Sequence, residues 1–467
     1  MIEIIPNLRH DINKPLYIQI YEYFKEEILN RKITAGTRLP SHRKLAEHLQ
    51  VSRNTIELAY QQLLTEGYAE SKPKKGLYAA DVSYDVMKRK QESFCITAKQ
   101  KIPAISYDFS QGHVDASVFP LTIWKRITTD CLYTNEERWF TAEDPQGEPE
   151  LRSELCQYLY HSRGVVCSPD QIVFGAGTQY LLWLLIQLIG TDDEYAMENP
   201  GFHRVRAMLQ SSSLSVSYID LDEQGIHVAS LQKTNAKTVY ITPSHQFPYG
   251  MIMPLARRLE LLQWANERNG YIIEDDYDGE FRYVGKPIPA LQGLDTNERV
   301  IYFGTFSKAF LPSVRMSYMI LPPALLKIYK ERGTIYKQTV SKLHQLTMYH
   351  FMKDGHWHRH LSRIRTLYKK KQKALIAAIE RYMGNHTEII GSQSGLHIVL
   401  DVKNGMAEEQ LIHTAAQYKV KVYPVSLYYA DSSPFLSRIL IGFGGLTEQE
   451  IEEAILLLNK AWFASEE

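Results

Sequence analysis

The sequence has few cysteines, no long apolar run and no excess charge of either sign. Its four cysteines, at positions 95, 131, 156 and 167, form no CxxC pair. This spacing argues against a disulfide framework or a zinc site and fits a reducing compartment. The longest apolar run, YLLWLLIQLIG, is too short to cross a bilayer, and MIEIIPNLRHDINK lacks the basic-then-apolar layout of a signal peptide. We therefore expect a cytoplasmic protein that makes no membrane contact.

The charges balance, with 53 Lys and Arg against 53 Asp and Glu. The whole molecule therefore carries no electrostatic sign of nucleic-acid binding, and any basic surface must be local. Residues 1–80 hold 12 Lys or Arg and 9 Asp or Glu, so their net charge of +3 (12 − 9) is only mildly basic. The 467 residues exceed one ordinary domain, and a hydrophobic content of 44% supplies the cores of two or three.

The N-terminal residues follow the element order of a winged helix-turn-helix. Residues 15–31 carry apolar side chains at helical spacing. Ser41 and Ser52 are predicted N-caps of a short helix, HRKLAEHL, and of a longer one, RNTIELAYQQLLTEG, which Gly67 ends. The next stretch, YAESKPKKGLYAA, suits two short strands with a basic tip. We therefore predict a winged helix-turn-helix domain over residues 12–80.

This domain is predicted to bind double-stranded operator DNA. The N termini of its second and third helices, together with the basic hairpin tip, are the places where phosphates and base edges are reached. The candidate DNA-binding residues are Ser41, Arg43, Ser52, Arg53, Asn54, Thr55, Lys74, Lys75 and Gly76. The alternative role for Arg53 is to form a surface salt bridge.

The rest of the chain divides into a connecting segment and a larger domain. Residues 81–106 are charged and weakly periodic, which indicates a linker, with a surface helix as the alternative. Over residues 107–467, apolar runs such as KTVYITP, GYIIEDD and RVIYFGT alternate with helical stretches, notably 178–189 and 254–269. This alternation predicts a large α/β domain around a largely parallel sheet. SGLHIVLDV and RILIGFGG, among helices from about residue 350, predict a smaller C-terminal α+β subdomain.

One lysine, Lys308 in GTFSKAFLPSVRMSY, directly follows an apolar strand. Ligands of open α/β sheets collect at the C-terminal ends of strands. The hydroxyls of Thr305 and Ser307 and the guanidinium of Arg315 suit a phosphate pocket around this amine. A lysine that forms a Schiff base needs a carbonyl partner, and pyridoxal 5′-phosphate supplies both an aldehyde and a phosphate. The predicted cofactor is therefore pyridoxal 5′-phosphate.

Three further stretches supply what this cofactor needs. In GAGTQYLLWLL, the backbone N–H groups of Gly177 and Thr178 would face an anion at a helix start. In IIEDDYDGEF, Asp275 is the candidate partner of the pyridinium nitrogen, and Tyr277 can hydrogen-bond the ring oxygen. In NPGFHRV, Phe202 is available to stack on the pyridine face.

Four motifs, in this order, carry a resemblance to a known family: LPSHRKLAEHLQVSRNTIELAYQQLLTEGY, EDPQGEPELRSELCQYLYHSRGV, EDDYDGEF and GTFSKAFLPSVRMSY. From about residue 14 to residue 460, the chain resembles the MocR/GabR-type transcription regulators. The resemblance implies a GntR-like winged helix joined to a class I aminotransferase-like domain of fold type I.

The resemblance also implies roles for individual residues. Lys308 would be the internal aldimine lysine and Asp275 the pyridinium partner. Arg438, in SRILIGFGG, matches the arginine that clamps the α-carboxylate of amino acids. Arg204 either helps to bind the effector or forms a structural ion pair. A small amine or amino-acid effector would displace Lys308 from the aldimine, and the family forms head-to-tail homodimers.

The chain departs from aminotransferases at HQFPYG, where they usually have Asn-Pro-Thr-Gly. The asparagine that hydrogen-bonds the ring oxygen is absent, with His245 or Gln246 as candidate replacements. The departure favours effector sensing over fast transamination. The alternatives are an active aminotransferase with an appended DNA-binding module and a cofactor-free dimerisation domain. The effector is left open among an ω-amino acid, a D-amino acid and the cofactor itself.

One histidine-rich and basic stretch, GHWHRHLSRIRTLYKKKQK, has a structural interpretation. His356 and His360 would share a helix face, but no third ligand is evident, so no metal site is predicted. KKKQK is predicted to be the exposed face of a long helix.

Overall fold

A computed structural model describes residues 8, 14–82, 105–134, 136–283, 288–431 and 437–463. The chain forms two compact units, residues 1–100 and 101–467. Most of the predicted linker, 83–104, lies outside the described residues. Each unit is therefore considered by itself.

The N-terminal unit contains helices α1 (Leu16–Leu29), α2 (His42–Leu49) and α3 (Arg53–Thr65), followed by strands β1 (Ala69–Lys72) and β2 (Gly76–Ala79). The two strands form an antiparallel hairpin. Apolar side chains from all three helices form one core, which includes Ile20, Phe24, Leu45, Ile56 and Leu63. The predicted order of helices and strands is confirmed.

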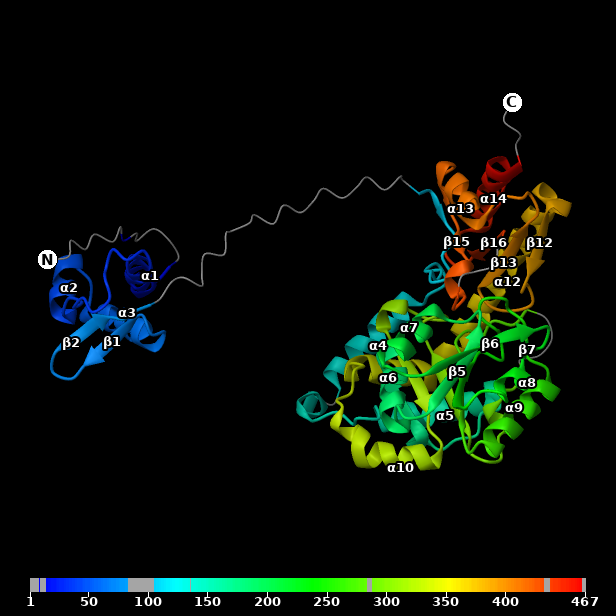
Figure 1. Ribbon diagram of the computed structural model, residues 1–467, viewed down its shortest axis with the longest axis horizontal. Helices are drawn as coiled ribbons and strands as arrows, with labels where there is room; N and C mark the ends of the chain where they lie inside the picture. Colours follow the sequence, from blue (N-terminus) through cyan, green and yellow to red (C-terminus); the bar gives the residue numbers. More distant parts are fainter. Residues whose placement is uncertain are drawn as a thin grey trace. The chain divides into compact units, whose positions relative to one another are not determined.

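The second unit is built on an eight-stranded sheet (Figure 1). Its strands, in spatial order, are β4 (Ile172–Gly175), β11 (Ser317–Ile320), β10 (Val300–Thr305), β9 (Tyr271–Asp276), β8 (Ala236–Ile241), β5 (Glu194–Asn199), β6 (Val216–Asp222) and β7 (Gly225–Ile226). The neighbours from β10 to β6 are parallel, whereas β11 and β7 pair antiparallel. The predicted α/β class with a largely parallel sheet is confirmed.

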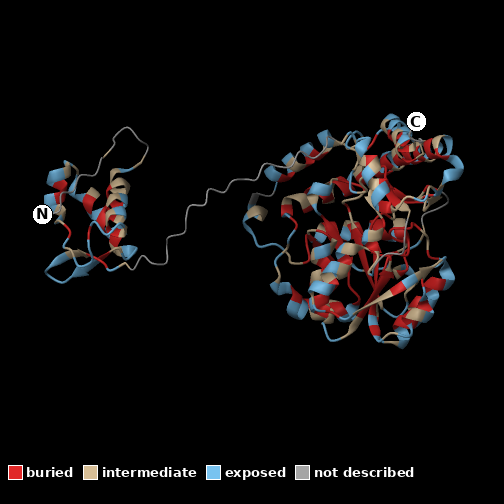
Figure 2. Ribbon diagram, turned by 45° about the horizontal axis from the view of Figure 1, so that its top comes forward, coloured by how far each residue is buried: buried red, intermediate tan, exposed pale blue. Residues whose placement is uncertain are grey.

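Helices cover both faces of this sheet, so its central strands are buried (Figure 2), whereas β6 is only partly buried. Side chains alternate along β10. Ile301 and Phe303 join the core that contains α6 (Thr178–Ile189) and α10 (Pro323–Arg332). Tyr302 joins the core on the other face. The other helices of this part are α4 (Leu121–Tyr133), α5 (Pro149–Arg163), α7 (His203–Ser211), α8 (Val228–Leu231), α9 (Leu255–Glu267) and α11 (Lys342–Lys353).

The C-terminal part is the predicted smaller α+β subdomain. Its sheet has the order β12 (Thr387–Ile390), β13 (His397–Val402), β16 (Arg438–Gly442) and β15 (Tyr423–Pro424). Helices α12 (His356–Tyr382), α13 (Glu408–Gln417) and α14 (Glu448–Phe463) accompany it. The short strand β14 (Val420–Lys421) pairs in parallel with β3 (Tyr107–Asp108), which ties the start of this unit to its C-terminal part.

The structure corrects the prediction for KKKQK. Lys369, Lys370 and Lys373 are exposed, but the side chain of Lys371 is only 2% exposed. Its ammonium group lies 2.5 Å from a carboxylate oxygen of Asp115 and donates to the carbonyl of Gly444. A buried charge requires such partners. Lys371 therefore ties the segment after β3 to α12.

Candidate functional site

In the N-terminal unit, serines begin both helices of the helix-turn-helix. Ser52 Oγ accepts a hydrogen bond from the backbone N–H of Thr55 at 3.1 Å, and Ser41 Oγ accepts one from Lys44. These caps confirm the predicted helix starts. Arg43, Arg53 and Asn54 are exposed in the first turns of their helices. Their side chains are therefore free to contact DNA at the places predicted from the sequence.

The hairpin places the other candidate residues at an exposed tip. Lys74, Lys75 and Gly76 are all exposed, and Lys74 adopts a left-handed conformation with φ of 60°. Arg38 was not predicted, but the structure brings it to this hairpin. It is exposed, and its backbone pairs with that of Tyr78 in an isolated antiparallel β-bridge. Arg38 extends the basic surface in a way that its sequence position, between two helices, did not reveal.

In the second unit, the predicted cofactor residues gather where neighbouring strands end. Asp275 lies near the C-terminal end of β9, Lys308 in the loop after β10, and Phe202 in the segment that follows β5. Because β9, β10 and β5 run in parallel in one sheet, these ends lie at the same edge. The fold therefore brings together residues that are up to about a hundred positions apart in the sequence.

Three consecutive acids end β9, and their partners distinguish them. Glu274 accepts backbone N–H groups of the 291–292 turn. Asp276 pairs with Arg163, with Nε 2.6 Å from Oδ2. Asp275 accepts a hydrogen bond from Tyr240 through Oδ2, while its buried Oδ1 has no partner among the described residues. Of the three, only Asp275 thus has an acceptor left for a ligand.

The environment of Asp275 suits a cationic partner. Burial raises the pKa of this carboxyl to about 7, and the charges of Asp276 and Asp278 add to the effect. The hydrogen bond from Tyr240 and the nearby Lys308 act in the opposite direction. A ligand N–H⁺ against Oδ1 would satisfy the orphaned oxygen and stabilise the ionised form. The pyridinium of pyridoxal phosphate fits this requirement.

Lys308 is half-buried, and burial lowers the pKa of its amine. Arg204 lowers this pKa further, whereas Asp278 and Asp275 oppose the shift. The Nζ atom donates to the backbone carbonyl of Gln111 at 3.2 Å. A lowered pKa increases the share of the uncharged amine, which is the form that attacks a carbonyl.

The candidate phosphate residues come from two loops. Gly177 has φ of +101° directly before α6, and a Cβ atom there would lie 2.5 Å from Nη2 of Arg315. The positive φ favours glycine, and a larger residue would have to displace the guanidinium from this helix start. Thr178 is the first residue of α6. Thr305 Oγ1 accepts hydrogen bonds from the N–H of Ser307 and from Ser317 Oγ, which holds the second loop together. A helix N terminus beside an arginine suits an anion.

The two aromatic candidates lie in one cluster. Phe202 stacks on Phe247, with ring centroids 3.9 Å apart and planes 4° apart, and meets Tyr277 edge-on. Tyr277 is buried, and its hydroxyl lies 2.8 Å from Nδ1 of His245. His245 thus contacts Tyr277, the residue predicted to bind the ring oxygen of the cofactor. Gln246 instead donates to the backbone carbonyls of Pro200 and Phe247.

The two candidate carboxylate-binding arginines have different surroundings. Arg438 Nε lies 2.8 Å from Asp401, its partner on the neighbouring strand, and Nη1 donates to the hydroxyl of Tyr249 at 3.0 Å. Arg204 is exposed in the first turn of α7 and is close enough to Lys308 to influence its pKa. Arg438 would therefore have to share or exchange partners to clamp a ligand carboxylate.

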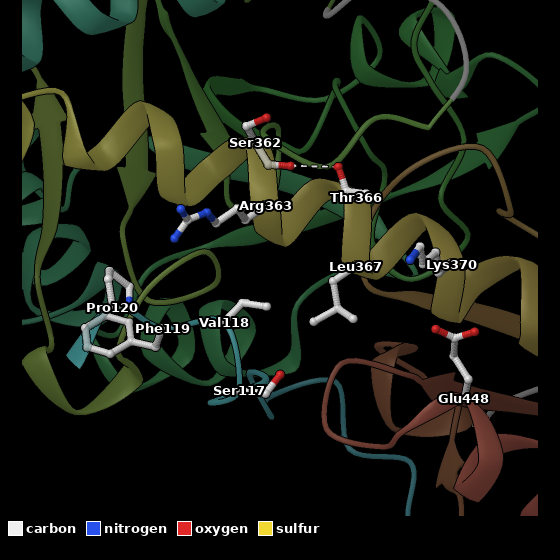
Figure 3. Close-up of a pocket in the computed structure, with 10 residues that line it drawn as sticks. All are labelled: Ser117, Val118, Phe119, Pro120, Ser362, Arg363, Thr366, Leu367, Lys370 and Glu448. Carbon is white, nitrogen blue, oxygen red and sulfur yellow. Dashed lines mark hydrogen bonds between the residues drawn. The ribbon is translucent and has the colours of Figure 1, made fainter. Parts of the chain in front are cut away.

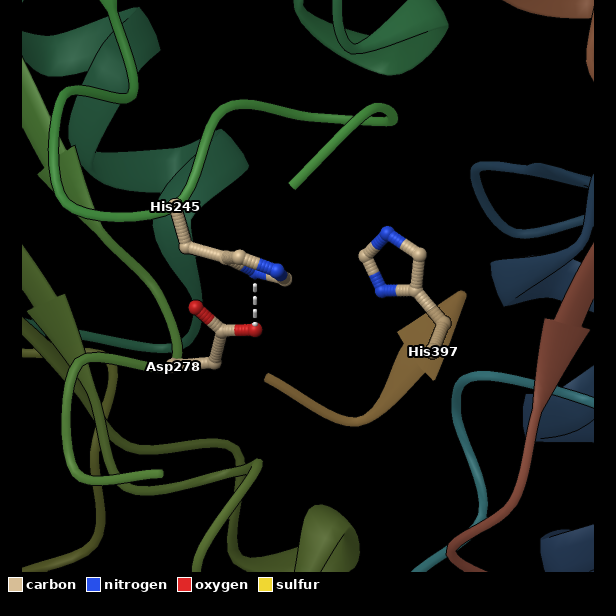
Figure 4. Close-up of side chains that lie close together, drawn as sticks. All are labelled: His245, Asp278 and His397. Carbon is tan, nitrogen blue, oxygen red and sulfur yellow. Dashed lines mark hydrogen bonds and ion pairs between the residues drawn. The ribbon is translucent and has the colours of Figure 1, made fainter. Parts of the chain in front are cut away.

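Histidines lie together in a different place from the one the sequence indicated. Among the described residues, potential ligand atoms of His245, Asp278 and His397 lie within 4.8 Å of one another (Figure 4). His245 and Asp278 already share a hydrogen bond of 2.9 Å. His360 is buried against the carbonyl of Ala309, and His356 contacts Arg359.

A surface groove of about 630 Å³ lies away from the predicted cofactor residues (Figure 3). It is bordered by the segment 117–120, by α12 and by Glu448 at the start of α14. None of the residues predicted to bind the cofactor, effector or DNA lines it.

In the described part of the chain, no helix has both the length and the apolar character needed to cross a membrane.

Comparisons with known proteins match both units. The family model of aminotransferase class I and II matches residues 112–457, and that of the gntR family of bacterial regulatory proteins matches residues 16–78. The MocR rhizopine catabolism regulatory protein of Rhizobium meliloti is 31% identical, over 98% of this chain and 96% of its own. The chain belongs to the MocR/GabR-type transcription regulators.

Other relatives of this MocR/GabR-type regulator agree with the assignment. The HTH-type transcriptional regulator YhdI of Bacillus subtilis is 47% identical over 98% of each chain. The multiple substrate aminotransferase of Thermococcus profundus has a TM-score of 0.70 at 23% identity, over 78% of this chain and 92% of its own. The latter likeness establishes the fold of the larger unit.

Proposed function

We propose that this transcription regulator uses pyridoxal phosphate at Lys308 to sense a small amine or amino acid, and that the N-terminal unit binds operator DNA. The observation that carries the proposal is that Lys308, whose pKa is lowered, lies at the same sheet edge as Asp275, whose buried Oδ1 has no hydrogen-bond partner among the described residues. When bound, the cofactor supplies an aldehyde that reacts reversibly with primary amines.

Each residue of the pocket has a defined task in this proposal. Asp275 accepts the N–H of the pyridine ring and holds the positive charge there. The N terminus of α6, at Gly177 and Thr178, binds the phosphate together with Arg315, Thr305 and Ser307. These donors fix the orientation of the cofactor with respect to Lys308.

The effector is an amine that competes with Lys308 for the same site. Arg438 binds the carboxylate of an amino-acid effector in place of its present ion pair with Asp401. Arg204 adds positive charge near the amine of Lys308. Lys308 then returns to hydrogen-bonding the backbone. Its present acceptor, Gln111, lies in the segment that follows β3, close after the residues that connect the two units.

Operator binding rests on the exposed helix starts and the hairpin tip. Arg53 and Asn54 at the start of α3 are the candidates for base contacts, and Lys74, Lys75 and Arg38 for phosphate contacts. A head-to-tail homodimer would present two such units, so an operator with two half-sites is expected. The effector shifts the population of DNA-binding arrangements, an allosteric coupling that is typically about 1–3 kcal/mol.

The experiment follows bound cofactor and bound DNA together. Amines are added to the loaded protein, and both visible absorbance and operator affinity are measured. An amine that changes both in wild type, but leaves operator affinity unchanged in Lys308→Ala, supports the proposal. Continuous formation of keto acid from the same amine would instead favour the aminotransferase alternative. Operator affinity that ignores every amine that alters the absorbance would contradict sensing.

A further inference from the structure

His245 takes up a defined position beside the hydroxyl of Tyr277. It lies in the loop after β8, and only 2% of its surface is exposed. Its Nδ1 atom is 2.8 Å from Tyr277 Oη and 2.9 Å from Asp278 Oδ2. Figure 4 shows the ring of His245 above the carboxylate of Asp278, with His397 facing both across a gap.

These contacts determine where the hydrogens lie. A carboxylate accepts hydrogen bonds and cannot donate them, so the Nδ1 atom of His245 must carry the hydrogen it shares with Asp278. The hydroxyl oxygen of Tyr277 then acts as the second acceptor of this N–H group. The hydroxyl hydrogen of Tyr277 is therefore not consumed by His245 and is available to a ligand.

Packing keeps the imidazole in this orientation. A Cβ atom on Gly395 would lie 2.0 Å from Cε1 of His245, and one on Gly250 would lie 2.8 Å from Nε2. Both glycines thus pack directly against the ring. Turning the ring over would place a carbon at Asp278 instead of the Nδ1 donor. The ring therefore keeps this orientation although its buried Nε2 has no hydrogen-bond partner among the described residues.

His397 does not compete for the same hydrogens. Its Nε2 atom donates to the carbonyl of Pro248 at 2.9 Å, which leaves Nδ1 as an acceptor. Burial, with His245 and Lys308 nearby, lowers the pKa of His397 well below its usual value. His397 is therefore a neutral neighbour of the His245–Asp278 pair.

We propose that His245, oriented by Asp278, is a positioning residue that directs the hydroxyl hydrogen of Tyr277 to the ring oxygen of the cofactor. The inference rests on the proposed function only in that pyridoxal phosphate binds here. It explains how the pocket holds the ring oxygen although HQFPYG lacks the asparagine found in aminotransferases. His245 acts through Tyr277 and does not itself contact the ring.

The test measures the pH at which the visible absorbance of the loaded protein changes. A donor to the ring oxygen stabilises negative charge there and keeps the midpoint low, so loss of the donor raises it. Other ionisable groups surround this site: Asp275, Asp278, Glu198 and Tyr240 lie near Tyr277, and His245 and Lys308 lie near His397. The comparison is therefore made within a double-mutant cycle that leaves all of them except His245 in place.

Four variants make up this experiment: His245→Leu, His245→Asn, Tyr277→Phe and the double variant His245→Leu/Tyr277→Phe. We expect His245→Leu and Tyr277→Phe each to raise the midpoint by about one pH unit, and the double variant to raise it no further. His245→Asn should remain close to wild type, because its amide nitrogen can occupy the place of Nδ1. An unchanged midpoint in His245→Leu, additive shifts, or an equal shift in His245→Asn would overturn the proposal.

A second measurement needs no variant and no cofactor. Nitrogen-15 NMR of the histidine rings in the cofactor-free protein should show the Nδ1–H form of His245, whereas an Nε2–H form would overturn the proposal. Absence of any visible band after incubation with pyridoxal phosphate would contradict the proposed function instead. The two failures are therefore distinguishable.

Discussion

Replacing Asp275 by asparagine is expected to stabilise the cofactor-free protein and to weaken its binding of pyridoxal phosphate. In the folded protein, burial raises the pKa of Asp275 from an ordinary 3.8 to about 7. The folded state then binds protons more tightly than the unfolded state, so stability falls as the pH rises between these two values. Asparagine keeps the shape but cannot ionise, which removes this loss.

The size of the effect follows from the two pKa values. With 3.8 and about 7, the penalty for ionising Asp275 is about 2 kcal/mol at pH 5.5 and about 4 kcal/mol at pH 8.5. The stability advantage of Asp275→Asn should therefore grow by about 2 kcal/mol between these pH values. Glu198, whose pKa burial also raises to about 7, is present in both proteins, so the part of its contribution that comes from burial cancels in the comparison. The charge of Asp275 also raises the pKa of Glu198, so its removal acts in the same direction as the expected effect.

Tryptophan fluorescence during urea denaturation is a suitable assay. All six tryptophans lie between residues 124 and 462, so the signal reports on the aminotransferase-like unit and not on the DNA-binding unit. Wild type and variant are compared without cofactor at pH 5.5 and 8.5. A difference in stability that is independent of pH, or that shrinks as the pH rises, would refute the reasoning.

The same variant should behave in the opposite way toward the cofactor. Loss of the charged acceptor for the pyridine N–H removes a hydrogen bond to a charged group, typically about 1.5–3 kcal/mol. Affinity for pyridoxal phosphate should therefore fall about 10- to 100-fold. Unchanged affinity would mean that Oδ1 of Asp275 does not face the ring nitrogen.

Three other substitutions test separate parts of the molecule. Borohydride should fix the cofactor on Lys308, as located by mass spectrometry. Lys308→Ala should lose the several-fold effector response of a reporter gene while it still binds operator. A full wild-type response in this variant would exclude Lys308 as the switch. Arg53→Ala should weaken operator binding by about 1–3 kcal/mol if Arg53 contacts a base, or reduce the salt dependence of operator affinity if it contacts a phosphate. The absorbance of the cofactor should not change. Unaltered operator affinity at every salt concentration would show that Arg53 is not part of the interface. Lys371→Met should lower the free energy of unfolding, measured by urea denaturation, by about 3–5 kcal/mol because Asp115 loses its partner, whereas Lys369→Met at an exposed site should not. Adding Asp115→Asn to Lys371→Met should recover much of this loss. Equal stability of the two single variants would contradict the buried ion pair.

Local patterns in the sequence predicted much of the fold. Ser41 and Ser52 precede helices because their hydroxyls satisfy free backbone N–H groups, an interaction between near neighbours in the chain. The strands KTVYITP, GYIIEDD and RVIYFGT were predictable because their apolar residues are continuous. The strand β6 was not predicted, because its residues are only partly buried and its pattern is weak.

The candidate site could be predicted only in part. Lys308 and Arg315 stand in a motif that carries its own chemical meaning. The sequence alone favoured Asp275 among its acidic neighbours, but the reason became visible only when Arg163 was found on Asp276 and the 291–292 turn on Glu274. These partners come from distant parts of the chain, so no spacing reveals them.

The sequence by itself determined the two-part organisation, the helix starts, the strand cores and the residue types of the pocket, since all of these depend on neighbours along the chain. Only the tertiary structure decided which polar groups meet. It buried Lys371 against Asp115 within a run of otherwise exposed lysines, and it brought Cys156 and Cys167 to 3.7 Å without a disulfide. It also placed His245 between Tyr277 and Asp278. Such contacts arise when separate strands end at one edge of a sheet, and the order of strands in that sheet differs from their order in the chain.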